Sequence, residues 1–280
     1  MSPAIPAVVL GASGYVGGEL LRLIAAHPNF ELAAAVSDSR SSSRIGETFG
    51  HLAQAYSGVA FVGRNDWVDK VESGSSLALF SAAPHGASAA VIANALLATG
   101  TRNIDMHVVD SSADFRDARQ DDYEAVYSTQ HGAPQLLDQF SCAVPEHAKR
   151  IDTAHVGHPG CFATATLLAA VPLIQSGLTE ADLFVSGVTG STGSGRSPQP
   201  GTHHPDRNSN LYAYKPLSHR HAPEMAGLTS AATGRETVVH FVPHSGPFAR
   251  GIHITLQAKA KNVVSEAALR EAFAAAYDDS

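Results

Sequence analysis

The chain has 280 residues, of which 44% are hydrophobic and 16% are charged, a composition that excludes a disordered or fibrous protein. At roughly 100–200 residues per domain, this length predicts one large domain or two ordinary ones. The formal net charge of −7 gives no electrostatic reason to expect nucleic acid or an anionic membrane surface as a partner.

Cysteine content and hydropathy indicate the compartment in which the chain works. Its 2 cysteines, Cys142 and Cys161, cannot form a disulfide framework, which favours a reducing environment. The N-terminal segment has no basic region of the kind that begins a signal peptide. The longest apolar stretch, Phe162 to Ile174, is too short to span a bilayer. We therefore expect a soluble, cytoplasmic protein.

The first half of the sequence alternates short apolar runs with segments of helical periodicity. The predicted strands are 7–10, 32–36, 77–80 and 108–110. Predicted helices follow the first strand, from residue 20 to the break at His27-Pro28, and the third strand, through residues 91–97. Strands that alternate with helices of this length predict an α/β fold with a doubly wound parallel sheet.

The second half mixes helices, strands and loops without a fixed period. The predicted elements are a helix over 161–174, strands over 183–188, 238–242 and 252–256, and a final helix capped by Ser265. Between them lie a glycine–serine cluster at 190–195 and a polar stretch at 197–210, which we expect to be a loop. We place a domain boundary near residues 150–158, which gives a first domain over 1–157 and a second, α+β domain over 158–280.

Three glycines, Gly11, Gly14 and Gly17, form a G-x-x-G-x-x-G turn between the first predicted strand and the first helix. Glycines permit a tight turn and let the backbone approach a pyrophosphate, which then lies at the positive end of the helix. An ordinary turn is the alternative, but the flanking strand and helix favour a dinucleotide site. The candidate cofactor-binding residues of this turn are Gly11, Ser13, Gly14, Tyr15, Val16 and Gly17.

The residues that follow the second strand indicate which dinucleotide is bound. An acidic residue here, Asp38, would hydrogen-bond the adenosine ribose, whereas arginine and serine would hold a 2′-phosphate. Ser37, Arg40 and Ser41 are groups of the second kind. We therefore expect NADP (NADPH) as the cofactor, with Asp38 as the argument for NAD.

Cys161 is the candidate nucleophile because it stands at the predicted start of a helix, directly after Pro159-Gly160. The amino end of a helix stabilises a thiolate, which is the reactive form of cysteine. A buried structural cysteine is the alternative, and it suits Cys142 in its apolar, strand-like surroundings.

A thiol nucleophile needs a base or an imidazolium partner, and 15 histidines are too many to choose among by presence alone. His219 and His221 stand out because Pro223 suits the first turn of a helix, which places Glu224 within reach of His221. Surface histidines are the alternative. We expect no metal, because neither C-x-x-C nor H-E-x-x-H spacing occurs. The residues that would compete as zinc ligands are His203, His204, His219, His221 and Cys161.

Arginines and backbone amides are the candidate anion-binding groups. Arg116 follows the carboxyl end of a predicted strand, where ligands of open α/β sheets bind. Arg196 and Arg250 are further candidates for a phosphate or a carboxylate, although each alone is more often a surface residue. The 190–195 loop can present backbone N–H groups to an anion or to the nicotinamide end of a cofactor.

Together these residues resemble the N-acetyl-γ-glutamyl-phosphate reductase family, the arginine-pathway relatives of aspartate-semialdehyde dehydrogenase. The resemblance runs from about residue 8 to residue 254, and its motifs follow the family's order. They are GASGYVGGEL, APHG, VDSSADFR, VPE, HPGCFAT, GSTGSGR, SHRHAPE and FVPHSGPFARG. HPGC together with HRHAPE is the most diagnostic, and the aspartate-semialdehyde branch lacks the HRH-x-PE segment.

The resemblance implies a Rossmann-type NADP domain, a catalytic and dimerisation domain, and a reaction in two steps. Cys161 would attack the acyl phosphate and expel phosphate, and NADPH would reduce the resulting thioester to N-acetylglutamate 5-semialdehyde. His221, or else His219, would be the acid/base, with Glu224 as its orienter. The resemblance also implies that Pro84 and Gly193 bind the cofactor. The substrate-binding residues would be Arg116, Ser191, Arg196 and Arg250.

Several alternatives stay open at this point. The activity would otherwise be that of aspartate-semialdehyde dehydrogenase or another acyl-phosphate reductase, or the chain would bind nucleotide without catalysis. The substrate would carry either a free acetylated or a carrier-linked amino group. The family forms homo-oligomers, so we expect a dimer or tetramer. Family members continue into a segment that completes the nucleotide domain, and we expect this chain, which ends at Ser280, to lack it.

Overall fold

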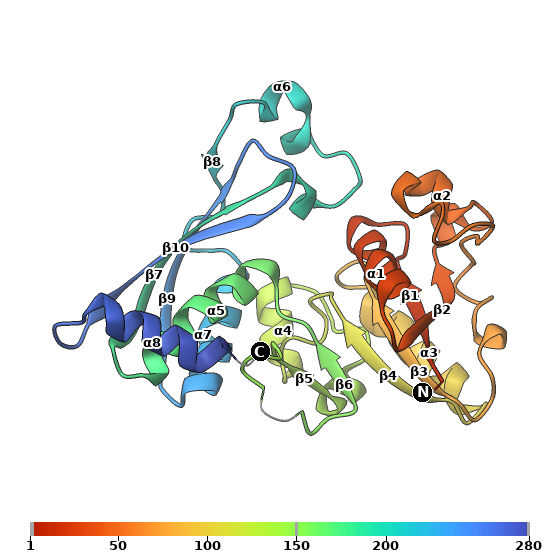
Figure 1. Cartoon of the computed structure of the whole chain (residues 1–280), viewed down its shortest axis with the longest axis horizontal. Coiled ribbons are helices and arrows are strands. Elements are labelled where there is room, and N and C mark those ends of the chain that lie inside the picture. Colours follow the sequence, from red (N-terminus) through yellow and green to blue (C-terminus); the bar gives the residue numbers. More distant parts are fainter. Residues whose placement is uncertain (1–2, 149–150, 279–280) are drawn as a thin grey trace. The chain divides into compact units, whose positions relative to one another are not determined.

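The computed structural model describes residues 3–148 and 151–278, which form two compact units (Figure 1). The first unit comprises Met1–Cys142 with Asp152–His158, and the second comprises Ala143–Ile151 with Pro159–Ser280. The chain therefore passes from one unit to the other at three points between residues 142 and 159.

The first unit is built on a six-stranded parallel sheet in the order β2-β1-β3-β4-β6-β5. Its strands are β1 (Ile5–Leu10), β2 (Phe30–Val36), β3 (Ser76–Ser81), β4 (Asp105–Asp110), β5 (Phe140–Cys142) and β6 (His155–Gly157). The predicted doubly wound sheet is confirmed. The strand order reverses between β1 and β3, and the carboxyl ends of strands at such a switch point are where open α/β sheets bind their ligands.

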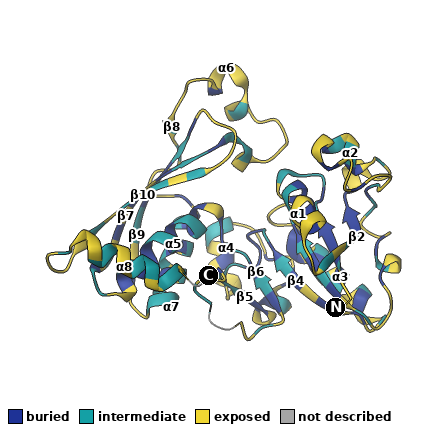
Figure 2. Ribbon diagram, viewed as in Figure 1, coloured by how far each residue is buried: buried dark blue, intermediate teal, exposed yellow. Residues whose placement is uncertain are grey.

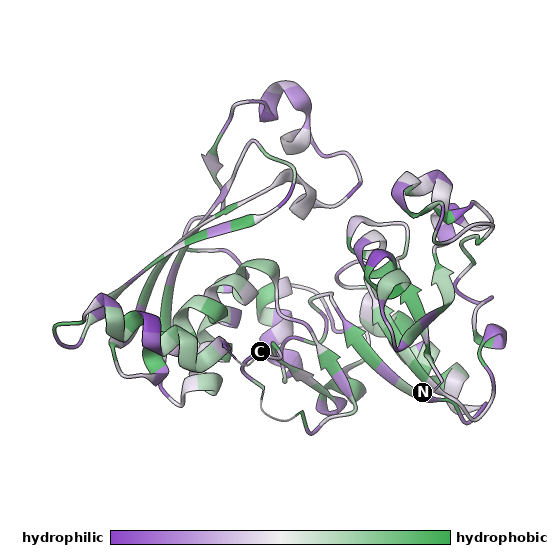
Figure 3. Cartoon of the chain, in the orientation of Figure 1, coloured by the Kyte–Doolittle hydropathy of each residue, from purple (hydrophilic) through white to green (hydrophobic). Residues whose placement is uncertain are grey.

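Helices cover both faces of this sheet, which explains why its strands read as continuous apolar runs. The helices are α1 (Tyr15–Ala26), α2 (Ile45–Thr48), α3 (Ser88–Gly100) and α4 (Gln120–Tyr127). Val8 packs in one apolar cluster with Ile92 of α3, whereas its neighbour Val9 packs in the other with Leu21 of α1. Successive strand residues point to opposite faces, so both must be apolar when both faces are buried. Figures 2 and 3 show these strands as buried and hydrophobic.

The glycine turn is shorter than the sequence analysis predicts. α1 begins at Tyr15, with Gly14 as its N-cap in extended backbone. Tyr15, Val16 and Gly17 therefore lie in the first helical turn, where the helix needs no apolar face yet and periodicity gives no signal.

The second unit contains a four-stranded mixed sheet in the order β10-β7-β9-β8. Its strands are β7 (Thr179–Thr189), β8 (Tyr212–Ala213), β9 (Val238–Ser245) and β10 (Ile252–Ala260). Its helices are α5 (Cys161–Gln175), α6 (His204–Arg207), α7 (His221–Thr233) and α8 (Glu266–Tyr277). α5 packs against α7, α8, β7 and β10. The predicted cap of the last helix is confirmed, because the Ser265 hydroxyl accepts a hydrogen bond from the Ala268 N–H at 3.2 Å.

The two faces of this second sheet differ in burial. Leu183 and Val185 of β7 are buried in the core with Phe162 of α5, whereas Phe184 between them is 53% exposed. The Phe184 ring stacks on that of His240 from β9, with ring centroids 4.6 Å apart. One face therefore packs on helices, and the other presents an aromatic pair. Within the described ranges, no helix is long and apolar enough to cross a membrane.

Candidate active site

Cys161 is the first residue of α5, and its side chain is exposed. The next residue, Phe162, is 1% exposed and lies against Gly187 of β7, where a Cβ atom would stand 2.4 Å from the Phe162 ring. The absence of a side chain at Gly187 thus lets the amino end of α5 sit close on the sheet. This packing fixes the helix end that carries the thiol, where the helix dipole favours a thiolate.

His219 and His221 lie beside this helix end. Their ring centroids are 4.7 Å apart, and each ring lies just over 6 Å from that of Phe162. Both histidines are buried, at 8% and 6% exposure. The structure therefore brings the two predicted acid/base candidates to the residue that follows Cys161 in the chain.

The surroundings of His219 hold its ring in the neutral form. His219 Nδ1 accepts a hydrogen bond from the backbone N–H of His221 at 3.2 Å, so the neutral ring carries its proton on Nε2. Burial, together with the positive charges of Arg220 and Lys215, lowers the pKa of His219 from 6.5 to about 4. His219 is therefore neutral near pH 7, which suits it poorly as an imidazolium partner of a thiolate.

Glu224 lies in the first turn of α7, and its Oε1 accepts a hydrogen bond from the backbone N–H of Gly160 at 2.6 Å. A charged acceptor makes this a strong hydrogen bond. Glu224 therefore joins the amino end of α7 to the residue that precedes Cys161.

Tyr214 belongs to the same group of residues, although no spacing in the sequence singled it out. Burial raises its pKa to about 12, and the nearby negative charge of a Cys161 thiolate contributes in the same direction. Its ring centroid lies 5.5 Å from that of His219. The signal that could have found it is its place in the YKPLSHRH segment, five residues before His219.

Two loops of the second unit, which carry Ser191 and Arg250, are joined by backbone hydrogen bonds. The N–H groups of Gly190, Ser191 and Thr192 donate to the carbonyl oxygens of residues 251, 248 and 249 at 2.9–3.1 Å. The prediction that this loop offers its amides to an anion is therefore wrong for these three, because the neighbouring loop already accepts them. Gly193, Arg196 and Arg250 are exposed along these loops.

The glycine turn of the first unit leaves no room for a side chain at Gly11 or Gly17. Gly11 has a φ of +67°, and a Cβ there would lie 2.4 Å from the Ala82 carbonyl oxygen. A Cβ on Gly17 would lie 2.5 Å from the Gly11 carbonyl oxygen. The turn thus forms a narrow backbone cradle that leads into the amino end of α1, as a bound pyrophosphate requires.

The residues after β2 distinguish between the argument for NADP and the argument for NAD. Asp38 accepts from the Arg64 N–H at 2.9 Å and pairs with the Arg64 guanidinium, which lowers the pKa of this carboxyl. The Ser37 hydroxyl lies 2.7 Å from that of Ser13 in the glycine turn. Arg40 and Ser41 are exposed. Because Arg64, which the sequence analysis did not single out, occupies Asp38, the arrangement favours a 2′-phosphate over a bare ribose.

Arg116 is anchored to backbone at the carboxyl edge of the first sheet. Its Nε donates to the His158 carbonyl oxygen at 3.0 Å and its Nη2 donates to that of Ser111 at 3.1 Å. His158 stands three residues before Cys161 in the chain. Pro84 is exposed in the turn that precedes α3.

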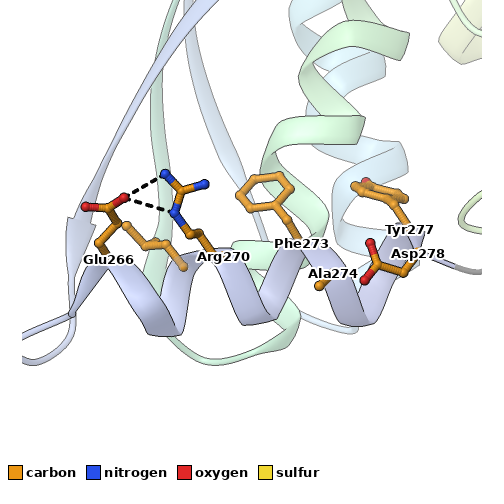
Figure 4. A pocket seen from close by; sticks show the side chains of 7 residues that line it. Glu266, Arg270, Phe273, Ala274, Tyr277 and Asp278 are labelled. Atoms are coloured by element: carbon orange, nitrogen blue, oxygen red, sulfur yellow. Dashed lines mark hydrogen bonds and ion pairs between the residues drawn. The ribbon is translucent and has the colours of Figure 1, made fainter.

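Other features of the molecule bear on binding. Among the described residues, no group of three or more histidine, cysteine, aspartate or glutamate side chains is placed to hold a metal ion. A shallow depression of about 560 Å³ along α8 contains none of the predicted site residues. Figure 4 shows side chains that line it. The depression is lined by Glu266, Leu269, Arg270, Phe273, Ala274, Tyr277 and Asp278.

Comparison with known proteins identifies relatives of both units. The semialdehyde dehydrogenase NAD binding domain matches residues 6–152, and the semialdehyde dehydrogenase dimerisation domain matches residues 161–280. The chain is 38% identical to the N-acetyl-gamma-glutamyl-phosphate reductase of Azotobacter vinelandii, over 89% of this chain and 71% of that protein. It is 34% identical, over 100% of this chain and 77% of the relative, to a phosphate reductase of Aeropyrum pernix named for LysW-linked L-2-aminoadipate and L-glutamate.

A solved structure shows the same fold at low sequence identity. The aspartate semialdehyde dehydrogenase of Candida albicans, crystallised with NADP, aligns with a TM-score of 0.61 at 15% identity. The alignment covers 96% of this chain and 75% of the other.

Proposed function

Because the chain belongs to the N-acetyl-γ-glutamyl-phosphate reductase family of semialdehyde dehydrogenases, we propose that it reduces N-acetyl-γ-glutamyl phosphate to N-acetylglutamate 5-semialdehyde. This is an oxidoreductase reaction of arginine biosynthesis with NADPH as the reductant. The observation that carries the proposal is an exposed cysteine at the first turn of α5, beside two buried histidines.

In the first step, the Cys161 thiolate attacks the acyl carbon, forming a C–S bond while the C–O bond to phosphate breaks. The dipole of α5 stabilises the thiolate, and the Cys161 N–H in the first helical turn is the donor we assign to the tetrahedral oxyanion. His221 takes the thiol proton before attack and later returns a proton to the thiolate. We assign this role to His221 rather than His219, because the low pKa of His219 makes that ring too weak a base to hold the thiol proton near pH 7.

NADPH, when bound, would supply the hydride that reduces the thioester, and the C–S bond would then break to release the aldehyde and the Cys161 thiolate. Gly11, Gly14 and Gly17 let the turn cradle the pyrophosphate, and Ser13, Tyr15 and Val16 line the start of α1. Ser37, Arg40 and Ser41 hold the 2′-phosphate, a role supported by the pairing of Asp38 with Arg64. Pro84 and Gly193 are the remaining cofactor-binding candidates.

For the substrate, we propose that cationic and hydroxyl groups hold its anionic ends. Arg116 binds the acyl phosphate, a role supported by the two carbonyl contacts that fix its guanidinium. Glu224 orients His221 and, through Gly160, the end of α5. The other substrate-binding candidates are Ser191, Arg196 and Arg250.

A carrier-linked acyl phosphate is the second candidate substrate. The Aeropyrum pernix relative named for LysW-linked substrates matches the full length of this chain, at an identity close to that of the acetylglutamyl enzymes. Both substrates carry an acyl phosphate, so they would share the chemistry at Cys161. They differ in the group on the amino nitrogen and, for 2-aminoadipate, by one methylene in the side chain.

We further propose that the enzyme is a cytoplasmic homo-oligomer that pairs through the open face of the second sheet. The match to a dimerisation domain over residues 161–280 supports this proposal. The exposed Phe184–His240 stack and Val238, 49% exposed, give that face apolar surface for a second copy to cover.

The reverse reaction tests the proposal. Purified protein receives NADP⁺, phosphate and N-acetylglutamate 5-semialdehyde, and NADPH formation is followed by absorbance, with Cys161→Ser as the control. Parallel reactions receive aspartate semialdehyde or a carrier-linked semialdehyde, and the ratio of kcat/KM values identifies the substrate. Binding of NADP⁺ without turnover of any aldehyde would indicate a non-catalytic relative. Turnover that Cys161→Ser leaves unchanged would overturn the mechanism.

A further inference from the structure

Two turns at the carboxyl edge of the first sheet are joined by a set of three hydrogen bonds. The Gly86 and Ala89 N–H groups donate to the two carboxylate oxygens of Asp114 at 2.7 and 2.9 Å. In return, the Ala113 N–H donates to His85 Nδ1 at 2.9 Å. The turn that follows β3 is thereby locked to the turn that follows β4.

Buried groups beneath these turns make the lock rigid. Asp114 is 1% exposed, and its N–H donates to the Ser112 hydroxyl at 3.1 Å. Asp110, fully buried at the end of β4, accepts hydrogen bonds from the hydroxyls of Ser88 and Ser112. Each polar atom named here has a partner, so neither turn is held by packing alone.

The lock determines the tautomer of His85. A ring nitrogen that accepts a hydrogen bond from a backbone N–H carries no proton, so the neutral ring carries its proton on Nε2. Nε2 lies on the far edge of the ring from Ala113, and the side chain is exposed. His85 is therefore an N–H donor held in one orientation by its own turn.

The turn that carries His85 also lies beside the glycine turn. Ala82, three residues before His85, donates its N–H to the Leu10 carbonyl oxygen at 2.9 Å. The Ala82 carbonyl oxygen approaches Gly11 so closely that a Cβ there would be 2.4 Å away. The turn that carries His85 is thus packed directly against the glycine turn, at the point where open α/β sheets bind their ligands.

We propose that His85 is a cofactor-binding residue whose Nε2–H donates to an oxygen of the pyrophosphate–nicotinamide half of NADPH, with the Ala113 contact holding that donor in place. The inference rests on the proposed cofactor and adds a residue that the glycine pattern does not include. The hydrogen bonds of Asp114 would then also matter for the substrate site, because the turn that contains Ala113, the partner of His85, continues to Arg116.

Two substitutions of His85 test the roles of its two ring nitrogens separately. In His85→Asn, the amide oxygen stands near the position of Nδ1 and can still accept from Ala113, but no group reaches the position of Nε2. In His85→Gln, the amide reaches the position of Nε2 but leaves the Ala113 N–H without its acceptor. The dissociation constants of NADPH and of adenosine 2′,5′-bisphosphate, which lacks the pyrophosphate–nicotinamide half, are measured for each variant by fluorescence titration.

We expect His85→Asn to weaken NADPH binding roughly 10-fold or more, the effect of losing one hydrogen bond to a charged group, while adenosine 2′,5′-bisphosphate binds as before. His85→Gln should weaken NADPH less and lower the melting temperature more. Unchanged NADPH binding in His85→Asn, or an equal loss for both ligands, would overturn the inference. Wild-type protein that binds NADPH but reduces no acyl phosphate would refute the proposed function and leave this inference standing.

Discussion

Glu224 on α7 accepts a hydrogen bond from the N–H of Gly160, the residue that directly precedes Cys161. A carboxylate from one helix therefore fixes the start of another, and does so at the residue that caps it. The position of the thiol depends on the packing of α5 and also on a single charged acceptor about sixty positions away in the sequence.

Replacement of Glu224 tests this contact. Glu224→Ala leaves the Gly160 amide without its acceptor and should lower the free energy of unfolding by about 1–3 kcal/mol, as measured by denaturant titration. Glu224→Gln keeps an acceptor but loses the charge, so we expect kcat to fall roughly 10-fold with little change in KM. Glu266→Gln, which breaks an exposed pair on α8, is the control and should change neither quantity. A wild-type unfolding free energy for Glu224→Ala would contradict the prediction.

The two cysteines should behave differently. Cys161 is exposed at a helix amino end, whereas Cys142 is half-buried in β5. We expect Cys161 to react faster than Cys142 with a thiol reagent near neutral pH, with the labelled residue identified by mass spectrometry. Cys161→Ser should lower kcat at least about 1,000-fold, and Cys142→Ser should retain activity. Equal labelling rates would argue against a nucleophile at position 161.

The depressed pKa of His219 predicts a pH dependence of stability. Because the folded pKa of about 4 lies below the ordinary value of 6.5, the unfolded chain takes up this proton first as the pH falls. The contribution of His219 is therefore complete above pH 6.5 and is lost as the pH falls toward 4.

His219→Asn should accordingly flatten the curve of unfolding free energy against pH in this window, by at most about 1.4 kcal/mol per pH unit. Burial also lowers the pKa of His155, so His155→Asn should likewise reduce the pH dependence of stability below pH 6.5. An identical slope in wild type and His219→Asn would show that His219 titrates normally.

Cofactor preference should respond to the residues after β2. Arg40→Ala should weaken NADPH roughly 10-fold and leave NADH unchanged, because only NADPH carries the 2′-phosphate. Arg64→Ala releases Asp38 toward the ribose and should shift the preference toward NADH. The ratio of kcat/KM for the two cofactors measures both effects. A parallel loss for both cofactors would mean that these residues act on the fold rather than on the phosphate.

The open face of the second sheet should control assembly. A charge at an apolar interface centre is costly, so Phe184→Asp should yield monomers in light scattering. Val263→Asp is the matched control, since Val263 is fully exposed and lies outside the strands. It should leave the mass unchanged. A wild-type mass for Phe184→Asp would place the interface elsewhere.

Elements with a strong apolar period were predictable from sequence, and polar or very short ones were not. The apolar runs around Val8 and Leu79 could only be strands, because both faces of the sheet are covered. α4, with the sequence QDDYEAVY, buries only Tyr123 and shows no apolar stripe. β5 and β6 have 3 residues each, too few for a periodic signal. α5 does not end at Pro172, because the buried residues around this proline keep the helix intact.

The residues of the candidate site likewise divide into those that the sequence predicts and those that it does not. Cys161, His219 and His221 stood in segments whose spacing carries chemistry, so sequence alone selected them. Arg64 acts through its contact with Asp38, 26 positions away in the chain, and no local pattern reports such a contact. The prediction that the 190–195 loop offers its amides to an anion was wrong for a related reason. Amides of this loop donate to carbonyl oxygens of the 248–251 loop, and only the fold brings the two loops together.

The position of β6 between β4 and β5 has a consequence for biosynthesis. The edge strand leaves the ribosome before its inner neighbour does, so β5 has no partner until residues 155–157 have been made. Residues 143–151, which lie between the two strands, belong to the other unit, and the remainder of that unit has not yet been made. The nascent first unit can close its sheet only when His158 emerges, and the next three residues synthesised are Pro159, Gly160 and the nucleophile itself.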